Sequence, residues 1–218
     1  MTAKHDVDAF RARYRAGIHP WYNAWLHGGF VFATGLAVIV LLLRQAGDIQ
    51  PLEWLALPLA LVFFSWGEYT VHRELGHRKH KLGALFYKRH TGDHHSFFVE
   101  DRMRYETVQD WRVIFFPAWL IVVYTLLLAL PAFLVLSLWS VNVAALFSAT
   151  LVGGYLMYEF FHACEHLPPE HFLARLPWIR QMRMHHARHH RRELMQTHNF
   201  NLVFPLVDWV KGTWHREP

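Results

Sequence analysis

The chain has 218 residues, of which 53% are hydrophobic and 18% charged, and its formal net charge at pH 7 is +5. A single cysteine excludes an intramolecular disulfide and thiolate-built zinc or iron–sulfur sites, and the apolar composition argues against nucleic acid as a partner. The length suits one domain, so we expect residues 1–218 to form a single membrane-embedded unit. The apolar residues gather in blocks separated by stretches rich in His and Arg, which indicates a membrane protein.

The first predicted element is an amphipathic segment, residues 1–26, in which arginines alternate with apolar side chains. This pattern is typical of a helix on a membrane surface, and Trp21, Tyr22 and Trp25 supply the aromatic residues common at the headgroup level. The apolar blocks that follow predict membrane spans, because one crossing takes about 20 residues. We expect four spans, roughly at residues 27–43, 52–71, 113–130 and 132–161.

The last two spans form an almost unbroken apolar run, in which Pro131 is the expected turn. Counting crossings places both histidine-rich segments, 72–112 and 162–218, on the same side as the amino terminus. Arg and Lys also concentrate there, and the positive-inside rule therefore predicts cytoplasmic histidines and termini. The expected fold is an all-α integral membrane bundle of about four transmembrane helices with a cytoplasmic, histidine-rich metal-binding cap.

Most of the eighteen histidines fall in four short clusters, which indicates a chemical role. About ten ligands exceed the four that close a structural zinc site, so two metal ions are the simpler explanation. Imidazole binds iron, zinc, copper and nickel, and the residue type leaves the metal open. A basic membrane interface is the alternative explanation of the clusters. The ten candidate ligands are His72, His77, His90, His94, His95, His162, His166, His186, His189 and His190, and the possible additional ligands are His80, His185 and His198.

Carboxylates are expected around such a site, because they can accept the free imidazole N–H groups and balance the charge of the metals. Five of them lie within a few residues of a cluster histidine. Surface charge at the membrane boundary is an equally good explanation for any single one. These candidates are Glu68, Glu74, Asp93, Glu159 and Glu165.

The histidine spacings resemble those of the fatty acid hydroxylase superfamily, which includes sterol desaturases and carotene hydroxylases. The resemblance begins near residue 60 and includes a closing stretch from Asn199 to Thr213. One motif departs from the family pattern H-x2-H-H, since the second cluster has three residues between His90 and the doublet. In the fourth cluster the family spacing selects His186 over His185. The matching motifs are His72-x4-His77, His94-His95, His162-x3-His166 and His186-x2-His189-His190.

The resemblance implies an oxidoreductase, a non-haem di-iron monooxygenase that uses O2 and two externally supplied electrons to hydroxylate an unactivated C–H bond. Zinc can replace the two iron ions in purified protein. The expected substrate is a lipid chain, with fatty acyl or sphingolipid acyl groups favoured. Electrons are expected from a separate donor such as ferredoxin or cytochrome b5. A basic face of the protein could bind this donor; a solvated or lipid-facing basic surface is the alternative interpretation of that face. The face consists of Arg183, Arg188, Arg191 and Arg192.

Several alternatives share this pattern of residues. A desaturase uses the same metal and oxygen chemistry, and sterols or carotenoids present the same kind of C–H target. A membrane metal transporter would need polar ligands within the spans, and the sequence places none at mid-membrane. A metal-binding structural protein is the remaining alternative of another class.

Overall fold

The computed structural model describes residues 6–81 and 83–216, which are helical apart from turns, loops and one isolated bridge between Val99 and Arg102. The chain divides into two compact units. Unit 1 comprises Met1–Ala24, Gly67–Phe115 and Phe161–Pro218, and unit 2 comprises Trp25–Trp66 and Phe116–Phe160.

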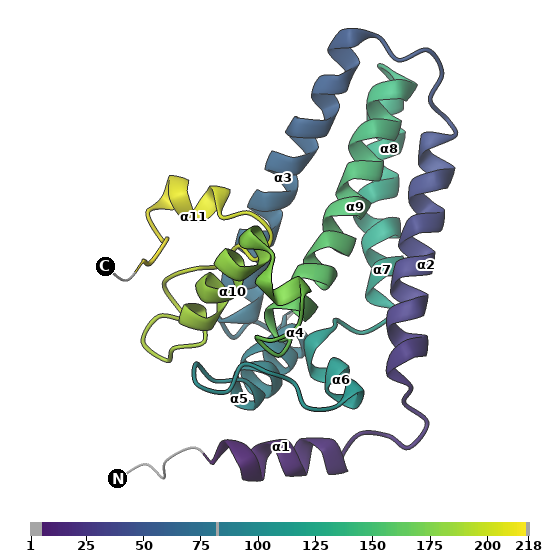
Figure 1. Cartoon of the computed structure of the whole chain (residues 1–218). Coiled ribbons are helices and arrows are strands. Elements are labelled where there is room, and N and C mark those ends of the chain that lie inside the picture. Colours follow the sequence, from purple (N-terminus) through teal and green to yellow (C-terminus); the bar gives the residue numbers. More distant parts are fainter. Residues whose placement is uncertain (1–5, 82, 217–218) are drawn as a thin grey trace. The chain divides into compact units, whose positions relative to one another are not determined.

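Unit 2 contains most of the apolar helical sequence (Figure 1). Within the described residues, four helical segments are long and apolar enough to cross a membrane. The prediction of an all-α chain with about four membrane-spanning helices is therefore confirmed. The segments are Ala24–Leu43 (α2), Pro51–Gly76 (the 3-10 turn η1 Pro51–Leu55, α3 Ala56–Thr70 and η2 Val71–Gly76), Leu120–Ser137 (α7 Leu120–Tyr124, η5 Thr125–Ala129 and α8 Leu130–Ser137) and Val141–Glu165 (α9).

The apolar faces of these helices are largely uncovered by protein. In α9, 61% of the most apolar stretch is buried, compared with 11% to 28% in the other three spans. Leu41 of α2 and Leu127 of η5 are among the many large apolar side chains that remain exposed. Apolar surface on this scale is unfavourable in water, so these faces suit the hydrocarbon of a bilayer.

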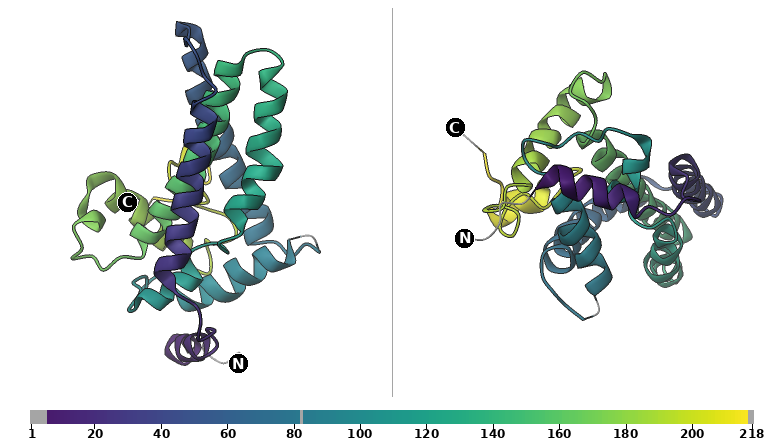
Figure 2. Two further views of the ribbon diagram at one scale, coloured as in Figure 1. Left: turned by 90° about the vertical axis from the view of Figure 1, so that its right-hand side faces the viewer. Right: turned by 90° about the horizontal axis from the view of Figure 1, so that it is seen from below.

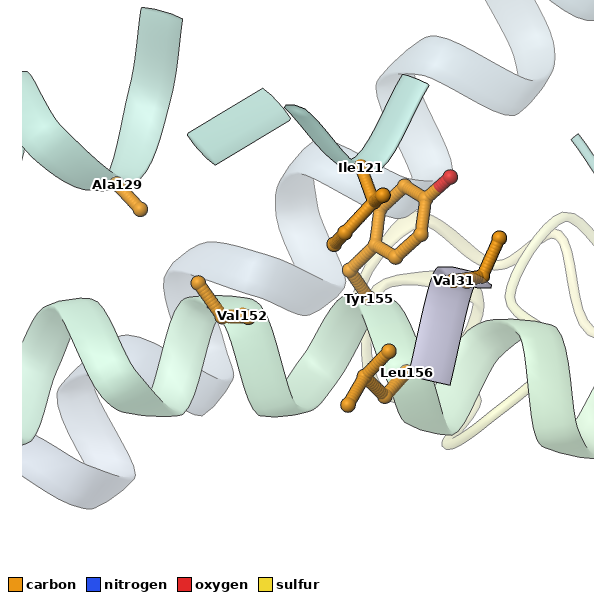
Figure 3. Packing of buried hydrophobic residues seen from close by; sticks show 6 residues of the cluster. All are labelled: Val31, Ile121, Ala129, Val152, Tyr155 and Leu156. Carbon is orange, nitrogen blue, oxygen red and sulfur yellow. The ribbon is translucent and has the colours of Figure 1, made fainter. Parts of the chain in front are cut away.

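The buried core of unit 2 is organised around α9 (Figure 3). Val152, Tyr155 and Leu156 of α9 pack with Val31 of α2 and Ile121 of α7, and Ala129 of η5 completes the cluster. On α3, the ring of Phe63 lies 5.9 Å from that of Phe147 on α9. A central α9 explains why this helix is the most buried of the four.

The turn between the third and fourth spans differs from the prediction. Pro131 lies in the first turn of α8, directly after the π-helical turn η5, where its missing N–H is tolerated. The helix ends only at Ser137, and Ser140 then caps α9 by accepting a hydrogen bond from the N–H of Val143 at 3.3 Å. The prediction of a turn at Pro131 is therefore wrong, because the capping serine rather than the proline sets the boundary.

A close approach of α3 to α9 gives a stability prediction. A Cβ added at Gly154 would lie 2.6 Å from two ring carbons of Phe64, whereas one added at Gly153 would lie 4.0 Å from the nearest atom, on Ile39. We expect Gly154→Ala to lower the free energy of unfolding in detergent by about 1–3 kcal/mol through overpacking. Gly153→Ala is the matched control and should unfold at the wild-type temperature; equal melting of the two variants would contradict this packing.

Unit 1 consists of short helices joined by loops. The amphipathic N-terminal segment forms a helix as predicted, but Arg11 on this helix is buried against protein. This helix, purple in Figure 2, contacts the short helix α5 (His95–Phe97). Besides η2, the elements are α1 Val7–Ala16, α4 Ala84–Tyr87, η3 Lys88–His94, α5 His95–Phe97, η4 Val108–Asp110, α6 Trp111–Ile114, η6 Leu173–Arg175, α10 Pro177–His189 and α11 Leu206–Lys211.

Candidate metal centre

Five buried imidazoles converge in what we call the first imidazole group: His72, His77, His90, His95 and His189. The Nε2 atom of His90 lies 2.8 Å from that of His72, 3.0 Å from that of His77 and 3.1 Å from that of His95. The Nε2 atom of His189 lies 2.9 Å from that of His77. Three separate stretches of unit 1 thus supply these side chains.

Two π-helical turns explain how the first group is assembled. Such a turn closes i→i+5 hydrogen bonds, so residues five apart lie on one face. The turn η2 contains His72 and is followed directly by His77, and the turn η3 contains His90 and is followed directly by His95. Both pairs are five residues apart, and both meet in the first group. The local backbone therefore selects which histidines share a face.

The second imidazole group consists of His94, His162, His166, His186 and His190. Four of them offer nitrogens that lie within 4.8 Å of one another, and the Nε2 atom of His162 is 3.2 Å from that of His94. The Nε2 atom of His190 lies 3.1 Å from those of His94 and His186, and His186 is 3.2 Å from His166. The two groups adjoin, since the rings of His95 and His190 stack 4.1 Å apart.

In five of these ten histidines the second ring nitrogen contacts a main-chain carbonyl. An Nδ1–H that donates to a carbonyl fixes the tautomer and leaves a lone pair on Nε2. These Nδ1 contacts are His72 to Phe200 O (2.5 Å), His94 to Val113 O (3.1 Å), His166 to Met103 O (2.7 Å), His189 to His198 O (2.9 Å) and His190 to Phe98 O (2.8 Å).

Converging lone pairs repel one another unless a cation lies between them. Imidazole nitrogens about 2.1 Å from a zinc-like ion are about 3.0–3.4 Å from one another, close to the 2.8–3.2 Å found here. Burial, together with the neighbouring His72 and His190, lowers the pKa of His77 to about 2, and burial lowers the pKa of His190 to about 3. The neutral form of imidazole, which binds metals, therefore predominates at neutral pH. Both groups fit metal ions.

Four of the five candidate carboxylates pair with groups other than the cluster histidines. Of the five, Glu165 is the one placed beside a cluster histidine, with an oxygen 3.9 Å from Nδ1 of His186. The others pair elsewhere: Glu68 with Asn201 and the N–H of Leu202, Glu74 with Arg78, Asp93 with Lys88, and Glu159 with Tyr155 and the N–H of Phe116. Backbone carbonyls fill the role that the sequence suggested for carboxylates.

The three possible additional ligands lie apart from both groups. The side chain of His80 is exposed. His185 is buried and its Nε2 lies 3.4 Å from a carboxylate oxygen of Asp208, whereas its neighbour His186 points into the second group. His198 contributes its carbonyl to His189, while its ring bonds to Thr197 at 2.9 Å.

The closing stretch of the chain forms a scaffold behind the first group. Asn199 adopts a left-handed conformation (φ 62°), in which asparagine is enriched. Asp208 is buried and accepts hydrogen bonds from the N–H groups of Phe200 (3.1 Å) and Asn201 (2.8 Å) and from the hydroxyl of Thr213 (2.7 Å). These bonds fix the loop whose carbonyl groups hold His72 and His189. In the sequence, this stretch stands out only through its resemblance to a family.

The family model for fatty acid hydroxylases matches residues 57–213, which is most of the chain. The chain belongs to the fatty acid hydroxylase family. The resemblance found in the sequence is thereby confirmed, and all ten candidate ligands lie within the matched residues. Family membership and the histidine clusters together fit a hydroxylase, and so an oxidoreductase, in a metal-dependent family of membrane enzymes. No curated protein and no solved structure was found to match the chain.

Proposed function

We propose that this protein is a di-iron, O2-dependent hydroxylase that acts on an unactivated C–H bond in a lipid chain, with fatty acyl or sphingolipid acyl groups as substrates. The observation that carries the proposal is the convergence of ten buried imidazoles in two adjoining groups, within a family of fatty acid hydroxylases. Each group would hold one ion. The ten histidines of the two imidazole groups are the proposed ligands, and zinc can replace iron in purified protein.

The protein groups have three tasks in this mechanism. The Nε2 lone pairs bind the ions, the main-chain carbonyls orient the rings, and the buried surroundings keep bulk water from the centre. When bound, the metal pair supplies the activation of O2 and the oxidation of the C–H bond, with two electrons from outside. The neutral ligands leave the positive charge of the ions largely uncompensated, and Glu165 is the nearest of the predicted carboxylates to a ligand ring.

The proposed orientation puts the histidines and both termini in the cytoplasm. Arg44 is the one Lys or Arg in unit 2, and the remaining basic residues belong to unit 1. That asymmetry follows the positive-inside rule.

We further propose a separate electron donor, a ferredoxin or a cytochrome b5. Among the four arginines suggested for docking, Arg191 pairs with Glu100, and Arg183 donates to the carbonyl of Leu167 at 2.5 Å. Arg192 is exposed at the end of α10. Charge reversal at Arg192 therefore tests docking with less disturbance of the fold than charge reversal at Arg183.

Lipid mass spectrometry tests the function. Cells that express the wild-type chain should contain a lipid heavier by one oxygen than cells without the gene. His94→Ala should abolish this product, because His94 contacts two other imidazoles of the second group. His80→Ala is the matched control and should leave the product unchanged, since His80 is exposed. Absence of an oxygenated lipid would exclude a hydroxylase, and loss of two hydrogens would identify a desaturase.

A further inference from the structure

The N-terminal helix α1 brings a buried arginine close to the metal centre. The side chain of Arg11 is 2% exposed, although α1 precedes the residues that the family model matches. A buried guanidinium is costly unless its N–H groups are paired. In Arg11, Nε donates to Phe97 O (2.8 Å), Nη2 to Arg102 O (2.6 Å) and Nη1 to a carboxylate oxygen of Glu106 (2.9 Å). Its main partners are thus carbonyls of the segment 97–104.

This segment is a tight turn whose two arms each hold a histidine of the second group. Phe98 O accepts from Nδ1 of His190 at 2.8 Å, and Met103 O accepts from Nδ1 of His166 at 2.7 Å. The arms are joined by the bridge between Val99 and Arg102, in which Arg102 N donates to Val99 O at 2.7 Å. The ring of Phe98 also stacks on His166, with centroids 4.0 Å apart.

The carbonyls used by Arg11 and by the histidines alternate along each arm. Phe97 O faces Arg11 and Phe98 O faces His190, while Arg102 O faces Arg11 and Met103 O faces His166. Successive carbonyls of an extended backbone point to opposite sides, and Phe98 is extended (φ −110°, ψ 126°). The guanidinium of Arg11 therefore holds both arms of the turn on one side, and the carbonyls on the other side orient two imidazoles.

We propose that Arg11 is a positioning residue for the second imidazole group, acting through the carbonyls of Phe98 and Met103. The proposal rests on the proposed metal centre and adds to it a residue of the N-terminal helix. It assigns Arg11 to one of the two ions, because both rings that it supports belong to the second group. The first group takes its carbonyls from the closing stretch instead.

The alternative is a purely structural role, in which Arg11 only anchors α1. Arg15 lies on the same helix and also anchors it, so a variant of Arg15 distinguishes the two roles. Arg15 binds both carboxylate oxygens of Asp110 at 2.8 Å and Glu106 at 2.9 Å. Its hydrogen bonds are to carboxylates, and the carbonyls of segment 97–104 are not among its partners in the described contacts. Arg15 also lies over the ring of Phe97, 5.3 Å from its centroid. Arg15→Gln therefore weakens the anchor of α1 while the hydrogen bonds from Arg11 to the carbonyls of the turn remain.

The experiment measures metal content and histidine reactivity in purified full-length protein loaded with iron or zinc. Wild type and Arg15→Gln should each hold two ions per chain. Arg11→Gln should bind one of them more weakly, by about 10-fold, because the carbonyls that hold His166 and His190 lose their support; complete loss of such an outer partner weakens binding about 10–100-fold. Modification by diethyl pyrocarbonate, mapped by mass spectrometry, should then increase at His166 and His190 and stay low at His72 and His77.

If Arg11→Gln does not fold, Arg11→Lys is the second variant to test. It keeps the positive charge, but its single nitrogen cannot bond to both arms of the turn, so it should show the same weaker binding of one ion. Retention of both ions in a folded Arg11 variant would overturn the proposal. So would equal loss from both groups, or the same loss in Arg15→Gln, since either indicates a structural role. Fewer than two ions in the wild type would instead count against the metal centre itself.

Discussion

Replacing His90 by alanine is expected to abolish the oxygenated lipid and to remove at least one ion per chain. Its Nε2 is the atom around which the first group converges, within 3.1 Å of the Nε2 atoms of His72, His77 and His95. Loss of an outer partner alone lowers metal affinity or activity about 10–100-fold, so loss of this side chain should lower product formation by more than about 100-fold.

His198→Ala is the matched control for this variant. His198 lies beside the site, but its contact with His189 is through the carbonyl, which alanine also has. The control should keep two ions and the wild-type product level by metal analysis and lipid mass spectrometry. If His90→Ala kept both ions and its product, the central position of His90 would have no role in binding metal.

The position of His90 also shows what could not be predicted from the sequence. Its spacing from the doublet has one residue more than the family pattern, so it was the one of the ten candidate ligands that the family spacing did not support. The π-helical turn η3 accommodates the extra residue, because it brings residues five apart to the same face. Histidine clusters could be predicted from residue type, whereas their grouping depends on local backbone geometry that the residue pattern does not encode.

The groups that orient the imidazoles were harder to predict than the imidazoles. Every residue has a carbonyl, so nothing in the sequence distinguishes Phe98 or Phe200 as an acceptor. Glu68 is four residues from His72, yet its carboxylate accepts the N–H of Leu202 at 2.7 Å from a distant part of the chain. Likewise, α1 could be predicted from its amphipathic pattern, but the burial of Arg11 depends on tertiary contacts with the segment 97–104.

Removing the carboxylate of Asp208 should destabilise the chain and weaken the first imidazole group. Asp208→Ala leaves the buried N–H groups of Phe200 and Asn201 without their acceptor, at a cost of about 1–3 kcal/mol each. The same loop presents the carbonyls that accept from His72 at 2.5 Å and His189 at 2.9 Å. We therefore expect a lower unfolding temperature in detergent and weaker binding of one ion, measured by metal analysis during dialysis against a chelator.

Asp93→Ala is the matched control, because Asp93 also lies near the histidines but pairs with Lys88, whose side chain is 70% exposed. Surface ion pairs of this kind contribute about 0–1 kcal/mol, so this variant should melt near the wild type and keep both ions. Should Asp208→Ala lose stability while both ions remain equally resistant to the chelator, the closing stretch would support the fold alone. Selective loss of the ion bound by the first imidazole group would make the rings of His72 and His189 more reactive. That result would show that the Asp208 carboxylate, which is not a ligand, supports the first group through the backbone.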